Sequence, residues 1–178
     1  VDIMRQEAVA LDIVTAAGAV KVVVPDYLTE VVATFSHLAR ASNQVNQRSG
    51  VSVRLSVSNL EVLGANALRR GLRAGEQVVV PRVSDLAALA ASTSGKIEIE
   101  SLEEGREGAI LENLVKAAVL TVFKQDVPLD QVRDVVTAFE QGAVVHTGDD
   151  VASVALAQLL DQVPALCAPV QSLIGGDE

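Results

Sequence analysis

The chain has 178 residues, of which 49% are hydrophobic and 21% are charged, and this is the composition of a globular protein rather than a disordered one. Its net charge of −9 disfavours wholesale binding to nucleic acid or to an anionic membrane, because like charges repel. Aromatic residues make up only 2%, so the core must be built from aliphatic side chains, which is typical of helical packing.

The chain contains one cysteine, Cys167, and two histidines, His37 and His146. One cysteine excludes an internal disulfide, and residues this scattered do not predict a metal site. We interpret all three as structural residues. A single thiol is typical of a reducing compartment, so we expect a cytoplasmic protein. No apolar run reaches the length of a membrane span, and no stretch reads as a secretory signal.

Residues 1–19 have apolar residues at loosely helical spacing, and we predict an N-terminal helical segment there. A short extended run follows and leads into Pro25, a residue suited to the first position of a helix. From Asp26 the apolar side chains recur at helical spacing until about residue 40, and they are Leu28, Val31, Val32, Phe35, Leu38 and Ala39.

A loop comes next, and in it Arg48 and Arg54 flank the small turn Ser49-Gly50-Val51-Ser52. We expect Ser56 or Ser58 to cap the following helix, which Gly75 ends. Its predicted buried residues are Leu60, Leu63, Ala67 and Leu68, and its predicted outer residues are Arg69, Arg70 and Arg73.

Residues 77–95 repeat an earlier order, a short extended run, a proline and a helix. Here Ser84 is the predicted cap, Leu86, Leu89 and Ala90 face inward, and Gly95 closes the element. Residues 96–107 change composition, and we place a subdomain boundary there. Within them Lys96-Ile97-Glu98-Ile99-Glu100 alternates with period two, as a short strand or an extended linker would.

The remaining residues, 108–178, predict further helices. The first pattern has Ile110, Leu114, Ala117, Ala118 and Val122, and the second has Leu129, Val132, Val135, Val136 and Phe139. A third begins at Asp149 or Asp150, and a last apolar segment follows Pro164. The sequence therefore predicts an all-α fold, a helical bundle over residues 20–95 followed by a C-terminal helical extension, with at most one short β element.

The sequence lacks the common signatures of catalytic sites. It has no phosphate loop, no dinucleotide fingerprint, no zinc-protease motif and no nucleophile elbow. The acidic run ESLEEGREG lacks the residue spacing of a calcium loop, and we interpret it as a solvated linker. The chain begins at Val1 and its only methionine is Met4, so we expect it to be a piece of a longer protein.

The arginines of the basic turn are the remaining candidates for a functional role. A guanidinium stays charged at physiological pH and offers a rigid fork of donors that suits phosphate oxygens. Arg54, held by a Gly/Ser turn just before a helix, would add its charge to the positive end of the helix dipole. From spacing alone, Arg54 is either a phosphate ligand or an ordinary solvated arginine.

Residues 50–89, GVSVRLSVSNLEVLGANALRRGLRAGEQVVVPRVSDLAAL, resemble the lid domain of AAA+ ATPases of the magnesium-chelatase and MoxR group. The pattern begins with Gly-x-Ser-x-Arg and continues through an amphipathic helix, a glycine turn, a valine run and an Asp-containing helix. The residues that match are Gly50, Ser52, Arg54, Ala65, Ala67, Arg69, Gly75, Val80 and Asp85. The resemblance extends over about residues 20–100 and is thinner beyond them.

The resemblance implies that Arg54 is the sensor 2 arginine, which reaches the γ-phosphate of ATP held by a neighbouring core domain. Arg48 would be an accessory ligand of the same site or a structural ion-pair residue. ATP and Mg²⁺ would be bound mainly by that core, whose motifs are not among these residues, so this piece alone is not expected to be catalytic. The full-length protein would form a homo-oligomeric ring, a hexamer, and remodel a partner that carries a von Willebrand A-type domain.

A second hypothesis treats the chain as a stand-alone helical adaptor. Its arginines would then be solvated, and its apolar grooves would hold a helix of another protein. The two hypotheses differ in what Arg54 binds.

Overall fold

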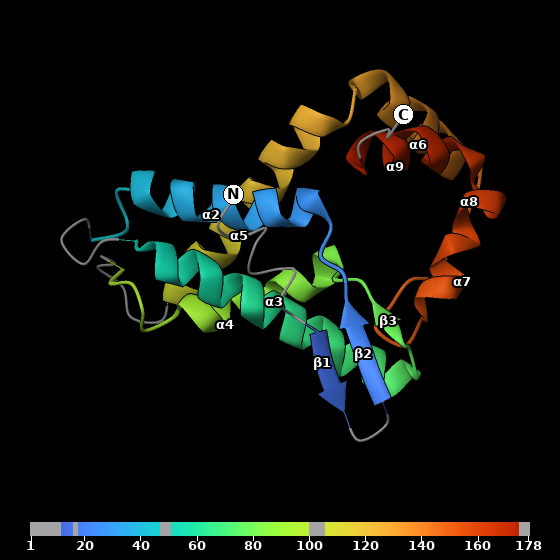
Figure 1. Cartoon of the computed structure of the whole chain (residues 1–178). Coiled ribbons are helices and arrows are strands. Elements are labelled where there is room, and N and C mark those ends of the chain that lie inside the picture. The colour runs from blue at the N-terminus through green and yellow to red at the C-terminus, as the bar shows by residue number, and fades with distance from the viewer. Residues whose placement is uncertain (1–11, 16–17, 47–50, 100–105, 175–178) are drawn as a thin grey trace.

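The computed structural model describes residues 12–15, 18–46, 51–99 and 106–174 (Figure 1). These residues are mostly helical, and their strands form one small sheet. The all-α fold with a short β element, predicted from the sequence, is therefore confirmed.

Helices α2 (Asp26–Ala41) and α3 (Val53–Ala74) are the two longest helices of the N-terminal half. Pro25 precedes α2 in an extended conformation that its ring favours, and α2 presents the expected apolar stripe to the core. Helix α3 begins earlier than predicted, with Ser52 rather than Ser56 or Ser58 at its N-cap position. It ends as predicted at Gly75, whose φ of 71° lies in the left-handed region that glycine adopts without strain.

The sheet consists of β1 (Asp12–Thr15), β2 (Gly18–Val22) and β3 (Val78–Val79). Strand β2 pairs antiparallel with β1 and parallel with β3. The two valine runs predicted to be extended thus pair with each other, and Val20 and Val79 pack on Ala67 of α3. The predicted helical segment 1–19 is wrong over β1 and the start of β2, because these two stretches pair with each other as antiparallel strands. Residues 1–11, 16 and 17 lie outside the described part.

A 3-10 helix, η1 (Val83–Ala87), leads into the short helix α4 (Ala88–Thr93). The sequence predicts Ser84 as the cap of this helix, and that prediction is wrong. Arg82 occupies the N-cap position instead, and its backbone N–H donates to the Asp85 carboxylate at 2.8 Å. Gly95 follows α4 with a φ of 75°, as expected of a glycine that closes a helix.

Residues 96–99 form isolated bridges rather than a strand. Ile99 pairs with Val45 and Ile97 with Ser94. Ile97 is buried and belongs to the main hydrophobic cluster, so this segment adds to the core.

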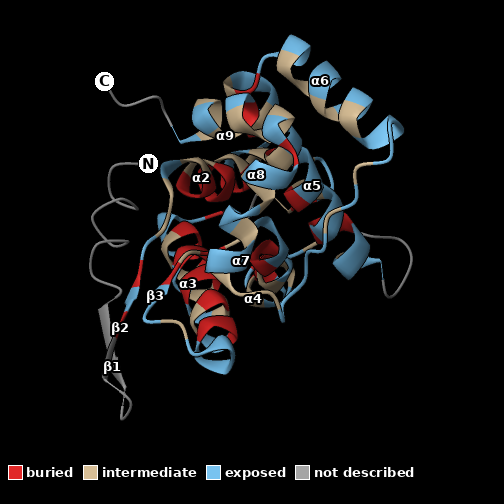
Figure 2. Ribbon diagram, turned by 90° about the vertical axis from the view of Figure 1, so that its right-hand side faces the viewer, coloured by how far each residue is buried: buried red, intermediate tan, exposed pale blue. Residues whose placement is uncertain are grey.

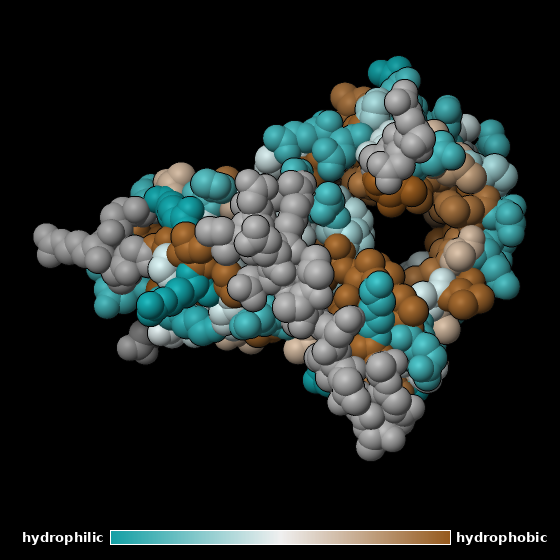
Figure 3. Space-filling view, in the orientation of Figure 1, coloured by the Kyte–Doolittle hydropathy of each residue, from teal (hydrophilic) through white to brown (hydrophobic). Residues whose placement is uncertain are grey.

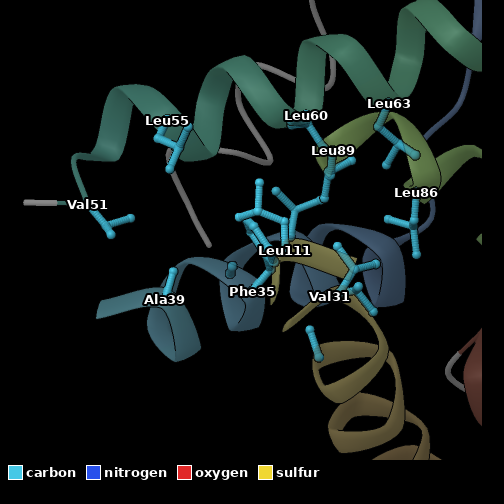
Figure 4. Packing of buried hydrophobic residues seen from close by; sticks show 14 of the residues in the cluster. Val31, Phe35, Ala39, Val51, Leu55, Leu60, Leu63, Leu86, Leu89 and Leu111 are labelled. Carbon is cyan, nitrogen blue, oxygen red and sulfur yellow. The ribbon is translucent and has the colours of Figure 1, made fainter. Parts of the chain in front are cut away.

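Helix α5 (Glu107–Asp126) packs against α2 and α4. Its residues Leu111, Val115, Ala118 and Val122 belong to the same hydrophobic cluster as those of α2, α3 and α4, and Figure 4 shows Leu111 among Phe35, Leu60 and Leu89. The compositional change at residues 96–107 therefore does not divide the core. We call α2, α3, η1, α4 and α5 the helical core.

Residues 129–174 form what we call the C-terminal arm. It contains α6 (Leu129–Glu140), α7 (Ser153–Ala157), α8 (Leu159–Gln162), a 3-10 turn η2 (Pro164–Leu166) and α9 (Cys167–Leu173). Helices α6, α7 and α8 contain no buried residue, and in Figure 2 they lie outside the buried parts of α2, α3 and α5. The apolar face predicted for α6 is only partly covered by α9, and Leu129, Val136 and Phe139 are exposed.

Candidate functional site

Arg54 lies in the first turn of α3, one residue after the helix begins, and its side chain is exposed. The sequence had predicted it in the loop ahead of the helix. Its neighbours Val51 and Leu55 are buried, which fixes the start of α3 on the core and leaves Arg54 on the solvent side. The Nε of Arg40 on α2 donates to the Val51 carbonyl at 2.7 Å and adds a polar tie at the same place.

Arg54 places a cation at the N-terminus of α3, where the first backbone N–H groups have no acceptor within the helix. These N–H groups and the helix dipole make such an end electropositive, and the guanidinium adds a full charge. An anion presented from outside the chain would meet both. Arg48, the other predicted residue of the site, lies outside the described residues.

The remaining residues singled out in the sequence do not gather around Arg54. His37 is exposed on α2, and His146 is exposed between α6 and α7, with its Nε2 3.9 Å from Oδ2 of Asp150. Cys167 is half-buried at the start of α9, with its Sγ 4.0 Å from the Leu160 carbonyl oxygen. Within the described ranges, no three histidine, cysteine, aspartate or glutamate side chains lie close enough together to hold a metal ion.

A second charged cluster, which the sequence did not predict, lies at the opposite end of α3. Its members come from α3, the turn after it, and the segment from β3 to η1; they are Arg70, Glu76, Arg82 and Asp85. Arg70 was predicted on the outer face of α3, but its side chain is only 4% exposed. Its Nη2 donates to the Val80 carbonyl at 2.8 Å and to Oδ2 of Asp85 at 3.1 Å.

Asp85 is the acceptor at the centre of this cluster. Besides the Arg70 guanidinium, it accepts a hydrogen bond from Nδ2 of Asn66 at 3.0 Å and one from the backbone N–H of Arg82. A buried ion pair loses its hydration, and only good geometry and further hydrogen bonds offset that cost. Asp85 meets this condition, so the pair fixes the β3–η1 segment on α3.

The side chains of Arg70 and Glu76 use fewer of their hydrogen-bonding atoms than Asp85 does. Nη1 of Arg70 lies 3.8 Å from Oε2 of Glu76, too far for a hydrogen bond, and neither atom has another hydrogen-bond partner among the described residues. The other carboxylate oxygen of Glu76, Oε1, accepts the backbone N–H of Ser153 in the C-terminal arm. Glu76 thus joins the buried cluster to the arm.

Arg82 joins the same two regions. Its Nη1 donates to the Gly148 carbonyl at 2.9 Å, and its Nη2 donates to the Val151 carbonyl at 2.6 Å. Burial, and then the nearby Arg70 charge, lower the pKa of Arg82, while Glu76 and Asp85 oppose them. An arginine begins from so high a pKa that it remains a cation, and its hydrogen bonds to the two carbonyls are charge-assisted.

The sequence did carry a signal for Arg70. Leu63, Ala67 and Arg70 follow one another at spacings of four and three, so all three lie on one face of α3. The periodicity predicts a buried position for Arg70, whereas its charge favours the outer face. No local pattern in the sequence predicts that Asp85 is its partner, because the pairing depends on how the chain folds back after Gly75.

Two apolar hollows lie near the cluster. One, of about 570 Å³, is a groove between η1–α4 and α5, lined mostly by apolar residues such as Leu86, Val115 and Phe123. The other, of about 600 Å³, lies between Tyr27, the β3–η1 segment and the C-terminal arm. Figure 3 shows an opening between the helical core and the arm with hydrophobic side chains around it. Burial raises the pKa of the Tyr27 phenol.

Comparisons of the chain with protein families, with curated proteins and with solved structures gave no match. In the described part of the chain, no single helix is both long and apolar enough to cross a membrane. Only the bent pair Ser153–Gln162 and Pro164–Leu173, whose axes meet at 109°, reaches that length and composition when its helices are taken together.

Proposed function

We propose that this chain is the helical lid and C-terminal extension of a magnesium-chelatase-like AAA+ ATPase of the MoxR group, and that Arg54 is its sensor 2 arginine. The observation that carries the proposal is the exposed guanidinium of Arg54 in the first turn of α3. It is consistent with a group that reaches out to a phosphate held by another domain, where a buried or ion-paired arginine would be unsuitable.

The order of elements supports the same proposal. The described elements follow one another in the order of that lid's sequence pattern: an extended run, α2, α3 with Ser52 and Arg54 of the Gly-x-Ser-x-Arg motif at its start, a left-handed glycine, a second extended run and η1–α4. The parallel pairing of β2 with β3 closes this series into one unit with α3.

Helix α3 has 22 residues and is therefore about 33 Å long. Arg54 is at one end, and the buried cluster of Arg70 and Asp85 fixes the other end to the rest of the core. Because α3 is packed on the core along its whole length, it moves together with the helical core as one rigid body. A contact between Arg54 and a γ-phosphate would hold that body at one angle, and loss of that phosphate on hydrolysis would release it.

In the proposed reaction, the positive charge of Arg54 offsets negative charge that spreads over the transferring phosphoryl group. ATP and Mg²⁺ would be bound mainly by the core domain of the full-length protein. From the resemblance we also propose a hexameric ring and a remodelled partner with a von Willebrand A-type domain.

The test is the ATP turnover of the full-length protein with Arg54→Ala. We expect turnover to fall by about 10²-fold or more, because one charged donor to the transition state is lost. Arg54→Lys should recover only part of it, since an ammonium keeps the charge but not the two-pronged geometry. Arg73→Ala is the matched control, because Arg73 is exposed on the last turn of the same helix.

Unchanged turnover in Arg54→Ala, with the protein folded, would remove Arg54 from the mechanism. The coding sequence upstream of Val1 gives an independent check, because an ATPase of this kind needs a phosphate loop there. Its absence would end the ATPase proposal altogether.

The adaptor hypothesis is the second candidate, and the uncovered apolar side chains of α6 favour it. Leu129 is 71% exposed and Val136 is 49% exposed, although both belong to the apolar face of an amphipathic helix. If the chain is an adaptor, replacing Val136 by Asp should abolish binding of its partner, whereas Arg54→Ala should change neither binding nor any ATP turnover.

A further inference from the structure

Residues 144–163 of the C-terminal arm, which we call the strap, run from α6 to the helical core and back to η2. The strap follows α6, touches the helical core near Gly148 to Ser153, and comes back through α7 and α8 to η2 (Figure 1). Helix α9 and η2 then pack on α6, and Oγ of Ser172 donates to Oε1 of Gln131 at 3.1 Å. The base of the strap is therefore held within the arm itself.

The tip of the strap is held on the core by hydrogen bonds from two side chains. Arg82 donates to the carbonyls of Gly148 and Val151, and Glu76 accepts the N–H of Ser153. Arg82 and Glu76 are themselves 4.0 Å apart and mostly buried. These two residues, which we call the catch, are fixed to the core through Asp85 and Arg70.

Apolar packing contributes little at the tip of the strap, since its one buried residue, Val163, lies at the base next to η2. Helices α7 and α8 contain no buried residue, and their extensive contacts are with each other and with η2. Leu156 and Leu160 face Tyr27, Val80 and Pro81 across the cavity of about 600 Å³. Because no hydrophobic core joins the two sides, loss of the catch removes most of what holds the tip.

We propose that the strap opens as a unit about its base, and that Arg82 and Glu76 are the catch that keeps it closed over the apolar cavity. With the catch intact, the cavity is bounded on one side by the core and on the other by α7 and α8. With the catch broken, the strap moves away and the apolar face formed by Tyr27, Val80 and Pro81 loses its cover on that side. This inference concerns the chain itself and does not depend on Arg54 or on ATP.

Amide hydrogen exchange of the full-length protein tests the proposal directly. Several strap amides are hydrogen-bonded within the strap, among them those of Val151, Leu156 and Val163. Because α7 and α8 have only five and four residues, they are not stable helices by themselves and open once the strap leaves the core, so the exchange of these amides reports its opening. In Arg82→Ala we expect exchange over residues 148–163 to become about tenfold faster or more, since charge-assisted hydrogen bonds are among the stronger ones. Exchange in α2, α3 and α5 should stay unchanged, and Arg73→Ala should behave as the wild type.

A second variant breaks the catch without removing a charge beside Asp85. Ser153→Pro deletes the N–H that Glu76 accepts, and proline is tolerated there because Ser153 is the first residue of α7. Ala152 already has the extended conformation that a following proline requires, with φ of −67° and ψ of 152°. Ser153→Ala is its matched control, because it keeps the N–H that Glu76 accepts and removes only the hydroxyl, whose contact with Nη2 of Arg82 is long at 3.5 Å.

The proposal holds if Ser153→Pro and Arg82→Ala each accelerate exchange over residues 148–163 relative to their controls while the helical core stays protected. It is overturned if Ser153→Pro exchanges like Ser153→Ala, because the strap is then held by something else. It is equally overturned if both variants accelerate exchange throughout the core, because Arg82 and Glu76 would then be general structural residues.

Discussion

Two arginines on one helix have opposite environments, and backbone geometry rather than residue type explains the difference. Arg54 is in the first turn of α3, where no later segment among the described residues folds back over it, and it is exposed. Arg70 is on the stripe that also carries Leu63 and Ala67, and the chain returning after Gly75 covers it. The carbonyl of Val80 and the carboxylate of Asp85 then replace its water.

Tyr27 gives a pH-dependent prediction at the same scale. Burial raises the pKa of its phenol above the ordinary value of 10.0, so the unfolded chain loses this proton at a lower pH than the folded chain. Above pH 10.0 the folded state therefore binds more protons, and the free energy of unfolding falls as pH rises further. Below that pH the contribution of Tyr27 is constant.

Urea unfolding at about pH 8 and about pH 11 measures this effect, and Tyr27→Phe isolates it because the ring remains and the ionisable group does not. We expect the loss of stability between the two pH values to be smaller in Tyr27→Phe than in the wild type. An equal loss in both proteins would mean that Tyr27 is not the group responsible.

At the scale of elements, the contact between α3 and β3 depends on Gly71. A Cβ at this position would lie 2.2 Å from Cγ2 of Val79 and 3.1 Å from its Cγ1. Val79 is fully buried, and its β-branched side chain has few alternative rotamers. Only glycine therefore lets the strand approach α3 closely enough for Val79 to pack on Ala67 and Val20.

We expect Gly71→Ala to destabilise the protein by about 1–3 kcal/mol, because overpacking outweighs the better helix propensity of alanine. Gly108→Ala is the control, since Gly108 is also helical and a Cβ there would meet nothing within 4 Å. That variant should be stabilised by about 0.4–1 kcal/mol. Thermal or urea unfolding compares the two, and a neutral Gly71→Ala would contradict the close approach.

At the scale of the whole molecule, the described hydrophobic core lies almost entirely in the first 127 residues. The main cluster draws on α2, α3, η1, α4 and α5, whereas α6, α7 and α8 bury nothing. Two leucines illustrate the contrast, because Leu111 of α5 is 0% exposed and Leu129 of α6 is 71% exposed.

We expect Leu111→Ala to cost about 2–5 kcal/mol, the range for a buried leucine that leaves a cavity. Leu129→Ala should change the free energy of unfolding by less than about 0.5 kcal/mol. Denaturant unfolding of the two variants measures this difference. A large loss in Leu129→Ala would mean that α6 is covered in solution by another surface, and its dependence on protein concentration would tell whether that surface is a second copy.

Much of the element order was predictable because it depends on local patterns. The apolar stripe of α2, the glycine that ends α3 and the all-α class follow from residue spacing and from the left-handed conformation that glycine tolerates. The strand at residues 12–15 was not predictable in this way. Its conformation depends on pairing with β2, and periodicity within one short segment cannot report a partner strand.

Part of the candidate site was likewise predictable from the sequence, and part was not. Arg54 was identified from the turn and from the helix that follows it, although the start of that helix was misplaced by several residues. The cluster of Arg70, Glu76, Arg82 and Asp85 was missed, because its members meet only after the chain folds back on α3. The contacts from Arg82 to Gly148 and Val151 join residues more than sixty positions apart.

The sequence by itself determined the helical class, the aliphatic core and the basic residue at the start of α3, since each is a property of composition or of a short stretch. Only the tertiary structure decided which arginine is buried, that α5 shares the core with α2, α3 and α4, and that the C-terminal arm is tied to the core through Arg82 and Glu76. The physical reason is that burial and ion pairing depend on which distant segments cover a residue. Spacing along the chain specifies a face of a helix, but not what that face contacts.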